Sequence, residues 1–408
     1  MKNNIRDFFL YSSSQVVMII FSIITSAIWA RYSTQEEYGI FQLFMSFIII
    51  AGVFNLPGLG MSMQLSSANN KNKNLAIALK IKLKYSIISS IFLLFIGFYF
   101  YFYKENILIS YLLFISSFLY PIYILSSLWE SWLTGIRKIK KLSFILILNS
   151  FISLSVVSFG LIYMKSITFT IFVLFLSIAI LNIIILRFFT IENKTLIEDK
   201  SLINYGYAFS GAVIISMLVG LDKFIISEYL SLSDVAIYGV AMTFVLKIKI
   251  LYATINKLIS PSILKAKDIT MAWQYIKYKM ILIWIGFILI GIIGFIFVDD
   301  IIVLIFTDKY EQSAMYAKWL WLIVSISRPI LYLSSILKAQ KKLKFAYYLE
   351  SINSIGKLVL LIVLLPFYHL WGMVYATLIV NFTALVYISV YFYIEYQKEI
   401  KGGSLQNV

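Results

Sequence analysis

The sequence contains no cysteine, and this absence excludes disulfide bonds and any reaction that needs a thiolate. It contains a single histidine, His369, so a metal site or a catalytic triad built on histidine is nearly excluded. Charged residues are also scarce, at 13% against about 25% in a typical soluble domain. With 61% hydrophobic residues, the chain has more apolar surface than a soluble core can hide.

The sequence also lacks the phosphate-binding motif Gly-x-x-x-x-Gly-Lys-Ser/Thr, so we expect no ATP hydrolysis within this chain. No other motif for a metal or an organic cofactor is present, and we expect none to be bound. The formal net charge of +16 would suggest nucleic-acid binding in a soluble protein. Here the basic residues fall in short connections between long apolar stretches, so no nucleic-acid partner is expected.

Long apolar stretches dominate what is present. A helix that crosses a bilayer needs about 20 mostly apolar residues. The stretches run without the alternation of a barrel strand, so they predict helices and an all-α polytopic membrane protein. We predict twelve spans, at roughly 8–30, 38–58, 81–103, 107–133, 142–163, 167–189, 202–229, 235–258, 279–298, 313–337, 345–365 and 370–394.

The distribution of lysine and arginine orients these spans. Most of them lie at the N-terminus, in the even-numbered connections and at the C-terminus. The odd-numbered connections hold few: Arg31, Lys104, Lys165, Lys223, Lys309 and Lys318. Because basic loops stay in the cytoplasm, both termini are predicted to be cytoplasmic.

Two short patterns occur twice in the chain, in the same order. The connection 30–40 and the connection 230–240 both lead into Tyr-Gly near the start of the next helix. The basic connection 133–140 resembles 337–344 in the same way. Such echoes indicate duplication. We therefore predict two six-helix lobes, 1–189 and 202–408, with a linker at 190–201.

An even number of spans in each lobe gives both lobes one orientation, related by a pseudo-two-fold axis along the membrane normal. In transporters built from such parallel repeats, the substrate site lies at the repeat interface near the bilayer midplane. The repeat therefore favours a transporter that works by rocking around a central, water-filled cavity.

Particular residues resemble those of a known family. These are Ala30-Arg31, Glu37-Tyr38-Gly39-Ile40-Phe41, Gly58-Leu59-Gly60, Leu221-Asp222-Lys223-Phe224-Ile225-Ile226 and Tyr238-Gly239. The whole chain resembles the Wzx-type polysaccharide flippases of the multidrug/oligosaccharidyl-lipid/polysaccharide exporter superfamily, and the motifs are short and moderately specific.

The resemblance implies a MATE-like fold in the bacterial inner membrane. It also implies translocation of an undecaprenyl-pyrophosphate-linked oligosaccharide, an O-antigen repeat unit or similar, to the periplasmic leaflet. A polysaccharide polymerase or ligase would then be a possible partner, as in lipopolysaccharide biosynthesis. The sugars themselves are not implied.

Charged residues inside the spans are the candidate site, because each is costly at bilayer depth. Arg328 lies within a predicted span and precedes Pro329, which favours a kink. A guanidinium can hold a phosphate by two hydrogen bonds, so Arg328 is a predicted substrate-binding residue. The alternative is a structural pair with a buried carboxylate.

Span 345–365 carries four polar residues, Glu350, Asn353, Ser354 and Lys357, at the spacing of one helical face. Such a face is expected to turn to the interior or to water. Lys357 is a predicted substrate-binding residue and Glu350 a possible ion-coupling residue. An interhelical network that only stabilises the bundle explains the same stripe equally well.

Three further residues complete the predicted site. Asp222 and Lys223 are neighbours near the outer end of span 202–229, and they point about 100° apart. We predict ion coupling, to a proton or sodium, for Asp222 and substrate binding for Lys223, although the lysine can also snorkel to the surface. Arg31, at the outer end of the first span, is either a gate cation that binds substrate or an interfacial anchor.

These observations support a flippase with a cationic central cavity, in which the polyprenyl tail stays among the membrane lipids. A drug or metabolite cation antiporter of the same fold is the first alternative, and it would depend on carboxylates. A membrane polysaccharide polymerase or ligase is the second. It is less favoured because the longest predicted outward connection, about 299–312, is too short for a catalytic site.

Overall fold

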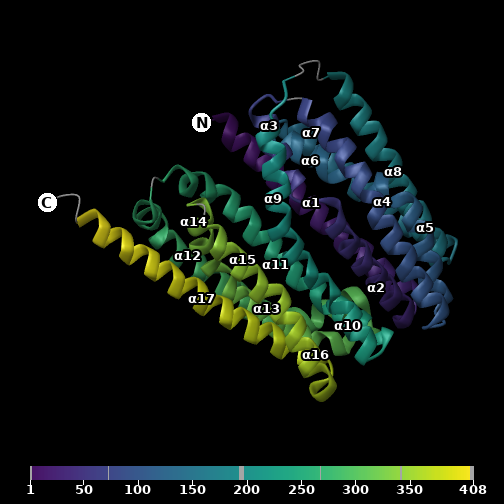
Figure 1. The fold of residues 1–408 in the computed structure, drawn as a ribbon. Helices are drawn as coiled ribbons and strands as arrows, with labels where there is room; N and C mark the ends of the chain where they lie inside the picture. Colours follow the sequence, from purple (N-terminus) through teal and green to yellow (C-terminus); the bar gives the residue numbers. More distant parts are fainter. Residues whose placement is uncertain (1, 72, 193–196, 267, 341, 405–408) are drawn as a thin grey trace. The chain divides into compact units, whose positions relative to one another are not determined.

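The computed structural model describes residues 2–71, 73–192, 197–266, 268–340 and 342–404 of the chain (Figure 1). The chain is 92% helical and the described residues contain no strand. Twelve helical segments in this part are long and apolar enough to cross a membrane, and each overlaps one predicted span. The number of spans and the all-α class are therefore confirmed, and the chain is a multi-pass membrane protein.

The packing divides the chain into unit 1, Met1–Leu221, and unit 2, Asp222–Val408. The division falls after the predicted linker 190–201, because the first part of the seventh span packs with unit 1. The lobes 1–189 and 202–408 stay a prediction.

The elements of unit 1 are α1 (Lys2–Tyr32), α2 (Gln35–Ala51), a 3₁₀ turn η1 (Gly52–Asn55), α3 (Leu59–Ala68), α4 (Lys73–Phe102), α5 (Ile107–Tyr123), α6 (Ser126–Gly135), α7 (Ile139–Ser158), a π-helical turn η2 (Phe159–Tyr163), α8 (Ile167–Glu192), α9 (Lys200–Met217) and a 3₁₀ turn η3 (Leu218–Leu221).

Unit 2 begins with a short helix and ends with a long one. Its elements are α10 (Asp222–Tyr229), α11 (Leu232–Lys265), α12 (Ile269–Phe306), a 3₁₀ turn η4 (Asp308–Tyr310), α13 (Glu311–Ser327), a 3₁₀ turn η5 (Arg328–Ile330), α14 (Leu331–Ala339), α15 (Leu343–Ser351), a π-helical turn η6 (Ile352–Gly356), α16 (Lys357–Tyr368) and α17 (Leu370–Ser404).

The connection predicted at 299–312 is nearly absent, which is a correction to the sequence analysis. Asp299 and Asp300 lie inside α12, which continues to Phe306. Thr307, with a φ of 75°, and the 3₁₀ turn η4 then lead directly into α13. The apolar run 301–306 carries the helix past the two aspartates, because it offers no cap and no breaker before Thr307.

The duplication is visible in the backbone of the basic connections. In unit 1 the N–H of Lys138 donates to the carbonyl of Leu133 at 3.1 Å, and in unit 2 the N–H of Lys342 donates to that of Leu337 at 3.2 Å. Lys138 and Lys342 also start the next helix with similar φ and ψ, −78° and 59° against −72° and 72°. Two connections with the same turn support descent of the two halves from one sequence pattern.

Unit 1 is held together in part by the close approach of α3 and α9. The N–H of Gly58 donates to the Ser210 hydroxyl at 3.1 Å, and the Ser62 hydroxyl donates to the Leu202 carbonyl at 2.6 Å. A Cβ at Gly58 would lie 2.5 Å from the Gly206 carbonyl oxygen, so only glycine permits this approach. The Gly58-Leu59-Gly60 segment therefore has a packing role.

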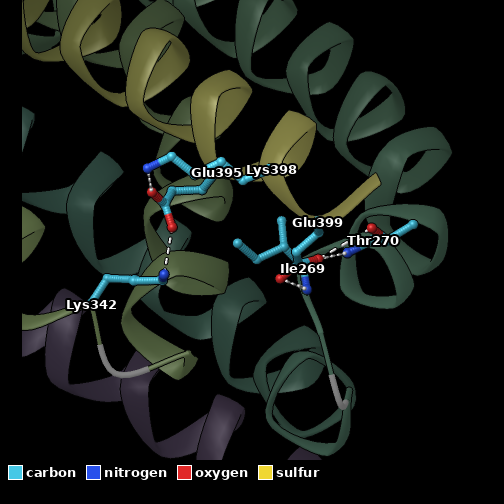
Figure 2. Close-up of polar contacts among 6 residues, drawn as sticks. All are labelled: Ile269, Thr270, Lys342, Glu395, Lys398 and Glu399. Carbon is cyan, nitrogen blue, oxygen red and sulfur yellow. Dashed lines mark hydrogen bonds and ion pairs between the residues drawn. The ribbon is translucent and has the colours of Figure 1, made fainter. Parts of the chain in front are cut away.

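In unit 2, the last turns of α17 contact the starts of neighbouring helices (Figure 2). Glu399 accepts hydrogen bonds from the N–H groups of Ile269 and Thr270, both at 3.1 Å, at the start of α12. One turn earlier, Glu395 pairs with Lys342 and with Lys398. The hydrogen bond to Glu395 raises the pKa of Lys342. These contacts fix the starts of two helices, α12 and α15, to α17. At α12 the Glu399 carboxylate is favoured because it lies at a helix N-terminus.

Candidate functional site

Three charged residues of unit 2 lie where a span departs from α-helical geometry. Asp222 opens α10 directly after the 3₁₀ turn η3, and Arg328 opens the 3₁₀ turn η5 between α13 and α14. Lys357 opens α16 directly after the π-helical turn η6. Irregular backbone at membrane depth is tolerated where it is buried in protein or lines a water-filled cavity. Breaks and charges at the same points indicate a functional region.

Asp222 and Lys357 form a buried ion pair with Tyr238 of α11. The Lys357 ammonium lies 3.2 Å from Oδ2 of Asp222 and 3.2 Å from the Tyr238 hydroxyl. The Tyr238 hydroxyl donates a short hydrogen bond to the same carboxylate oxygen, and the N–H of Lys223 donates to Oδ1 at 2.8 Å. All three side chains are buried, and Tyr238 is fully so. Lys357 is thus the counter-ion of Asp222.

The predicted polar stripe of span 345–365 is divided between two environments. Its first member, Glu350, lies in α15 and pairs with Lys338 of α14 at 3.0 Å, with part of both side chains exposed. Its last member, Lys357, lies beyond the π-helical turn and points to Asp222. A π turn holds an extra residue, so positions separated by seven no longer share one face. Both charged members have partners within unit 2.

Arg328 has no partner of this kind. It is half-buried, its Nε is buried without a hydrogen-bond partner, and no ion pair joins it to the described residues. Glu350 lies within electrostatic range of Arg328 but makes its ion pair with Lys338. Lys249 of α11, also half-buried, lies within electrostatic range of Arg328, Lys357 and Asp222. It too makes no ion pair with a described residue.

We call Asp222, Tyr238, Lys249, Arg328 and Lys357 the polar cluster. Two of its members were not predicted as site residues. Tyr238 was noticed only as part of the repeated Tyr-Gly pattern. Lys249 lies deeper in span 235–258 than the loop lysines, but snorkelling to the surface explained it equally well. A sequence signal for both existed, since a polar residue deep in an apolar span is costly without a function or a partner.

The remaining predicted residues lie outside the polar cluster or at its edge. Lys223 follows Asp222 in α10, is half-buried, and lies within electrostatic range of Asp222 and Lys357. Arg31 ends α1 in unit 1 and is exposed. The structure does not assign either residue to substrate, and both stay predictions. Among the described residues, no group of three His, Cys, Asp or Glu side chains could hold a metal ion.

Comparison with known proteins identifies the class of fold. No protein-family model and no curated protein sequence matches the chain. Solved structures do match over nearly its whole length, and they are transporters of the MOP superfamily, including MATE proteins and a lipid flippase. At 10–16% sequence identity these matches establish the fold and leave the cargo open.

Three structures illustrate the likeness. An inward-facing multidrug resistance MATE family transporter has a TM-score of 0.77 at 10% identity, covering 96% of this chain and 99% of that chain. The lipid II flippase MurJ, in an inward closed conformation, has a TM-score of 0.72 at 16% identity, covering 93% and 86%. A MOP superfamily transporter from Pyrococcus furiosus, described by the reverse polarity of its binding pocket, has a TM-score of 0.62 at 10% identity, covering 95% and 94%.

Proposed function

We propose that this chain is a flippase for an undecaprenyl-pyrophosphate-linked oligosaccharide, an O-antigen repeat unit or a similar precursor of surface polysaccharide. It would act in the bacterial inner membrane, with both termini in the cytoplasm, and deliver its cargo to a polymerase or ligase. One observation carries the proposal. In the part of unit 2 that the structure describes, Asp222 and Glu350 each pair with a lysine, whereas Arg328 and Lys249 make no ion pair.

A cation at bilayer depth without a counter-charge is costly. The diphosphate of a polyprenyl-linked oligosaccharide would supply that negative charge. Arg328 can hold a phosphoryl oxygen pair through its guanidinium, and Lys249 adds a second positive charge. The sugars remain in water and the polyprenyl tail in lipid, because each matches that solvent. Alternating access would then present the polar cluster to each side of the membrane in turn.

The same observation weighs against the antiporter alternative. A cation exporter needs a carboxylate that is available to its cargo or its coupling ion. Asp222 is held by Lys357 and Tyr238, and Glu350 is held by Lys338. Either carboxylate could bind a proton or a sodium ion only in a conformation that releases its lysine. The polymerase or ligase alternative loses the loop it required, because α12 and α13 are almost continuous.

The choice of cargo is tested with the purified full-length protein in liposomes. A fluorescent polyprenyl-diphosphate oligosaccharide is placed in both leaflets, and a glycosidase added outside reports the fraction that crosses. A cationic dye is tested in parallel under proton and sodium gradients. We expect the anionic lipid to cross and the dye to stay; transport of the dye alone would replace the flippase with the antiporter.

A further inference from the structure

A second group of unsatisfied polar atoms lies beside Arg328. The hydroxyl groups of Tyr252 in α11 and Tyr332 in α14 are both buried. Neither makes a hydrogen bond of ordinary geometry with a described residue, although the Ser335 hydroxyl lies close to that of Tyr252. The two rings lie side by side, with centroids 5.1 Å apart. Tyr332 is fully buried. A buried phenol normally finds a partner, so two orphaned phenols in contact need an explanation.

The helices place these phenols near Arg328 and Lys249. Tyr252 follows Lys249 by three residues within α11, so the two lie on one side of that helix. Tyr332 lies at the start of α14, directly after the 3₁₀ turn η5 that Arg328 opens. The segments α11, η5 and α14 contact one another within unit 2. Arg328 and Tyr252 are close enough to interact electrostatically. Two cations and two hydroxyl donors therefore converge on one seam.

The chemistry of this set selects its ligand. Guanidinium and ammonium groups only donate, and a phenol can donate, so the set favours an acceptor that carries negative charge. A diphosphate spreads its charge and oxygens over two phosphorus atoms and can engage both cations at once. We propose that Arg328, Lys249, Tyr252 and Tyr332 form the diphosphate subsite of unit 2. This inference rests on the proposed flippase function and assigns the headgroup to named residues.

In the conformation described here, the phenol oxygens are enclosed. A ligand reaches them only when the seam between α11 and α14 opens, and the 3₁₀ turn η5 lies at that seam. The closed seam keeps two donors unsatisfied, which is unfavourable without the ligand. Removing a hydroxyl should therefore leave the empty protein as stable or more stable, and weaken binding. A tyrosine with only a structural role would not combine unchanged or higher stability with weaker binding when its hydroxyl is removed.

The test uses the full-length protein in phosphatidylcholine nanodiscs, with inorganic diphosphate as the probe. Binding is measured by calorimetry and the Tm by tryptophan fluorescence, for Tyr252→Phe, Tyr332→Phe and the double variant. We expect each single change to weaken diphosphate binding about tenfold, while the Tm without ligand stays the same or rises. Wild-type protein that does not bind diphosphate, or a double variant with unchanged affinity, would overturn the subsite.

Tyr387→Phe is the matched control. The Tyr387 hydroxyl is also buried without a partner, but its ring stacks on Phe345 at 5.4 Å, in another part of unit 2. This change should leave diphosphate affinity as it is. An equal loss in Tyr387→Phe would show that any buried hydroxyl has this effect, and it would remove the assignment.

Two further arms separate the sources of phosphate and the two proposals. Nanodiscs that contain phosphatidylglycerol test a phospholipid headgroup: if that lipid displaces diphosphate with the same tyrosine dependence, the occupant is a phospholipid and the diphosphate assignment is wrong. Transport of the lipid-linked oligosaccharide without tyrosine-dependent binding would overturn the subsite alone. Tyrosine-dependent binding without transport would keep the subsite and contradict the flippase.

Discussion

Tyr38-Gly39 in unit 1 and Tyr238-Gly239 in unit 2 repeat one dipeptide in two different chemical settings. Both tyrosines are buried, at 1% and 0% exposure, so the scaffold uses them alike. Tyr38 stacks with Trp29 and Phe41, whose own rings lie 4.0 Å apart. Tyr238 instead donates to Asp222 and meets the Lys357 ammonium. The repeat preserved the position and changed what surrounds it.

The helix starts show how the two settings arose on a common frame. Both helices begin with a capping box, Thr34 with Glu37 and Ser231 with Asp234. Tyr38 comes four residues after its cap, whereas Tyr238 comes seven residues after. Tyr238 therefore lies about one turn deeper in its helix, on nearly the same face. At that depth it can satisfy a carboxylate that would otherwise be buried without a donor.

The buried lysines differ in the same sense. Lys82 of α4 is 2% exposed and bonds the hydroxyl of Ser127 at 2.5 Å, with no carboxylate partner among the described residues. Lys357 meets a carboxylate and a phenol. The two units thus share the helix pattern, whereas the buried ion pair among the described residues, Asp222 with Lys357, lies in unit 2.

The largest effect is expected from breaking the buried pair. Asp222→Ala leaves the Lys357 ammonium buried without its counter-ion, and we expect a loss of about 3–5 kcal/mol in stability, measured by thermal unfolding in detergent. The double change Asp222→Leu with Lys357→Leu should recover most of it, since an apolar pair needs no counter-charge. The repeat offset of 200 residues, from Tyr38 to Tyr238, places Ser22 of unit 1 opposite Asp222, and Ser22→Ala should cost far less. Similar losses in both units would contradict the contrast drawn here.

The repeated tyrosines give the next effect. Tyr238→Phe removes a hydrogen bond to a buried carboxylate, for which we expect a loss of about 1.5–3 kcal/mol in the same measurement. Tyr38→Phe keeps the ring that stacks on Trp29 and Phe41 and leaves the Asp222–Lys357 pair of unit 2 intact, so we expect it to cost less. If the two variants unfold at the same temperature, the tyrosine of unit 2 has no special electrostatic role.

A shared feature of the scaffold should cost both units alike. Thr34→Ala and Ser231→Ala each remove the side chain that accepts a bond at 3.1 Å from the third helical N–H. We expect each change to cost about 1 kcal/mol. Hydrogen exchange at the first turns of α2 and α11 would detect the two losses, and a large inequality would show that the capping boxes are not equivalent.

The smallest effect concerns a surface ion pair of unit 1. Glu198 lies 2.7 Å from Lys73, and the hydrogen bond to Lys73 holds the pKa of Glu198 below its ordinary value. Its contribution is present at neutral pH and is lost as the pH falls through that lowered pKa. Because the pair is exposed, Glu198→Gln should change the Tm at pH 7 little, and the difference from wild type should vanish in acid. A large change in Tm would show that this surface pair contributes as much to stability as the buried Asp222–Lys357 pair.

The sequence predicted the spans well, because length and composition suffice to recognise a helix that crosses a bilayer. The ends of these spans were less accurate: α12 continues beyond Asp299 and Asp300, which read as a loop. Arg328, Asp222 and Lys357 were recognised because a charge in an apolar run is rare. Their rarity said nothing about their partners.

The pairing could not be predicted, because it depends on contacts far apart in the sequence. Asp222 and Lys357 are separated by 135 residues, and the π-helical turn before Lys357 has no clear sequence signal. Helical spacing alone placed Glu350 and Lys357 on one face, and the extra residue of that turn separated them. That Arg328 makes no ion pair with a described residue likewise follows only from the positions of carboxylates far away in the sequence.

The most direct test of the central claim, that a free cation in unit 2 holds an anionic cargo, is charge reversal at Arg328. Arg328→Glu is compared with wild type and with Lys344→Glu, an exposed position in the same unit, in liposomes loaded with the polyprenyl-diphosphate oligosaccharide. The account predicts that Arg328→Glu loses translocation at least a hundredfold, since the barrier rises by more than about 2.7 kcal/mol, while Lys344→Glu keeps it. Undiminished translocation by Arg328→Glu would contradict the account.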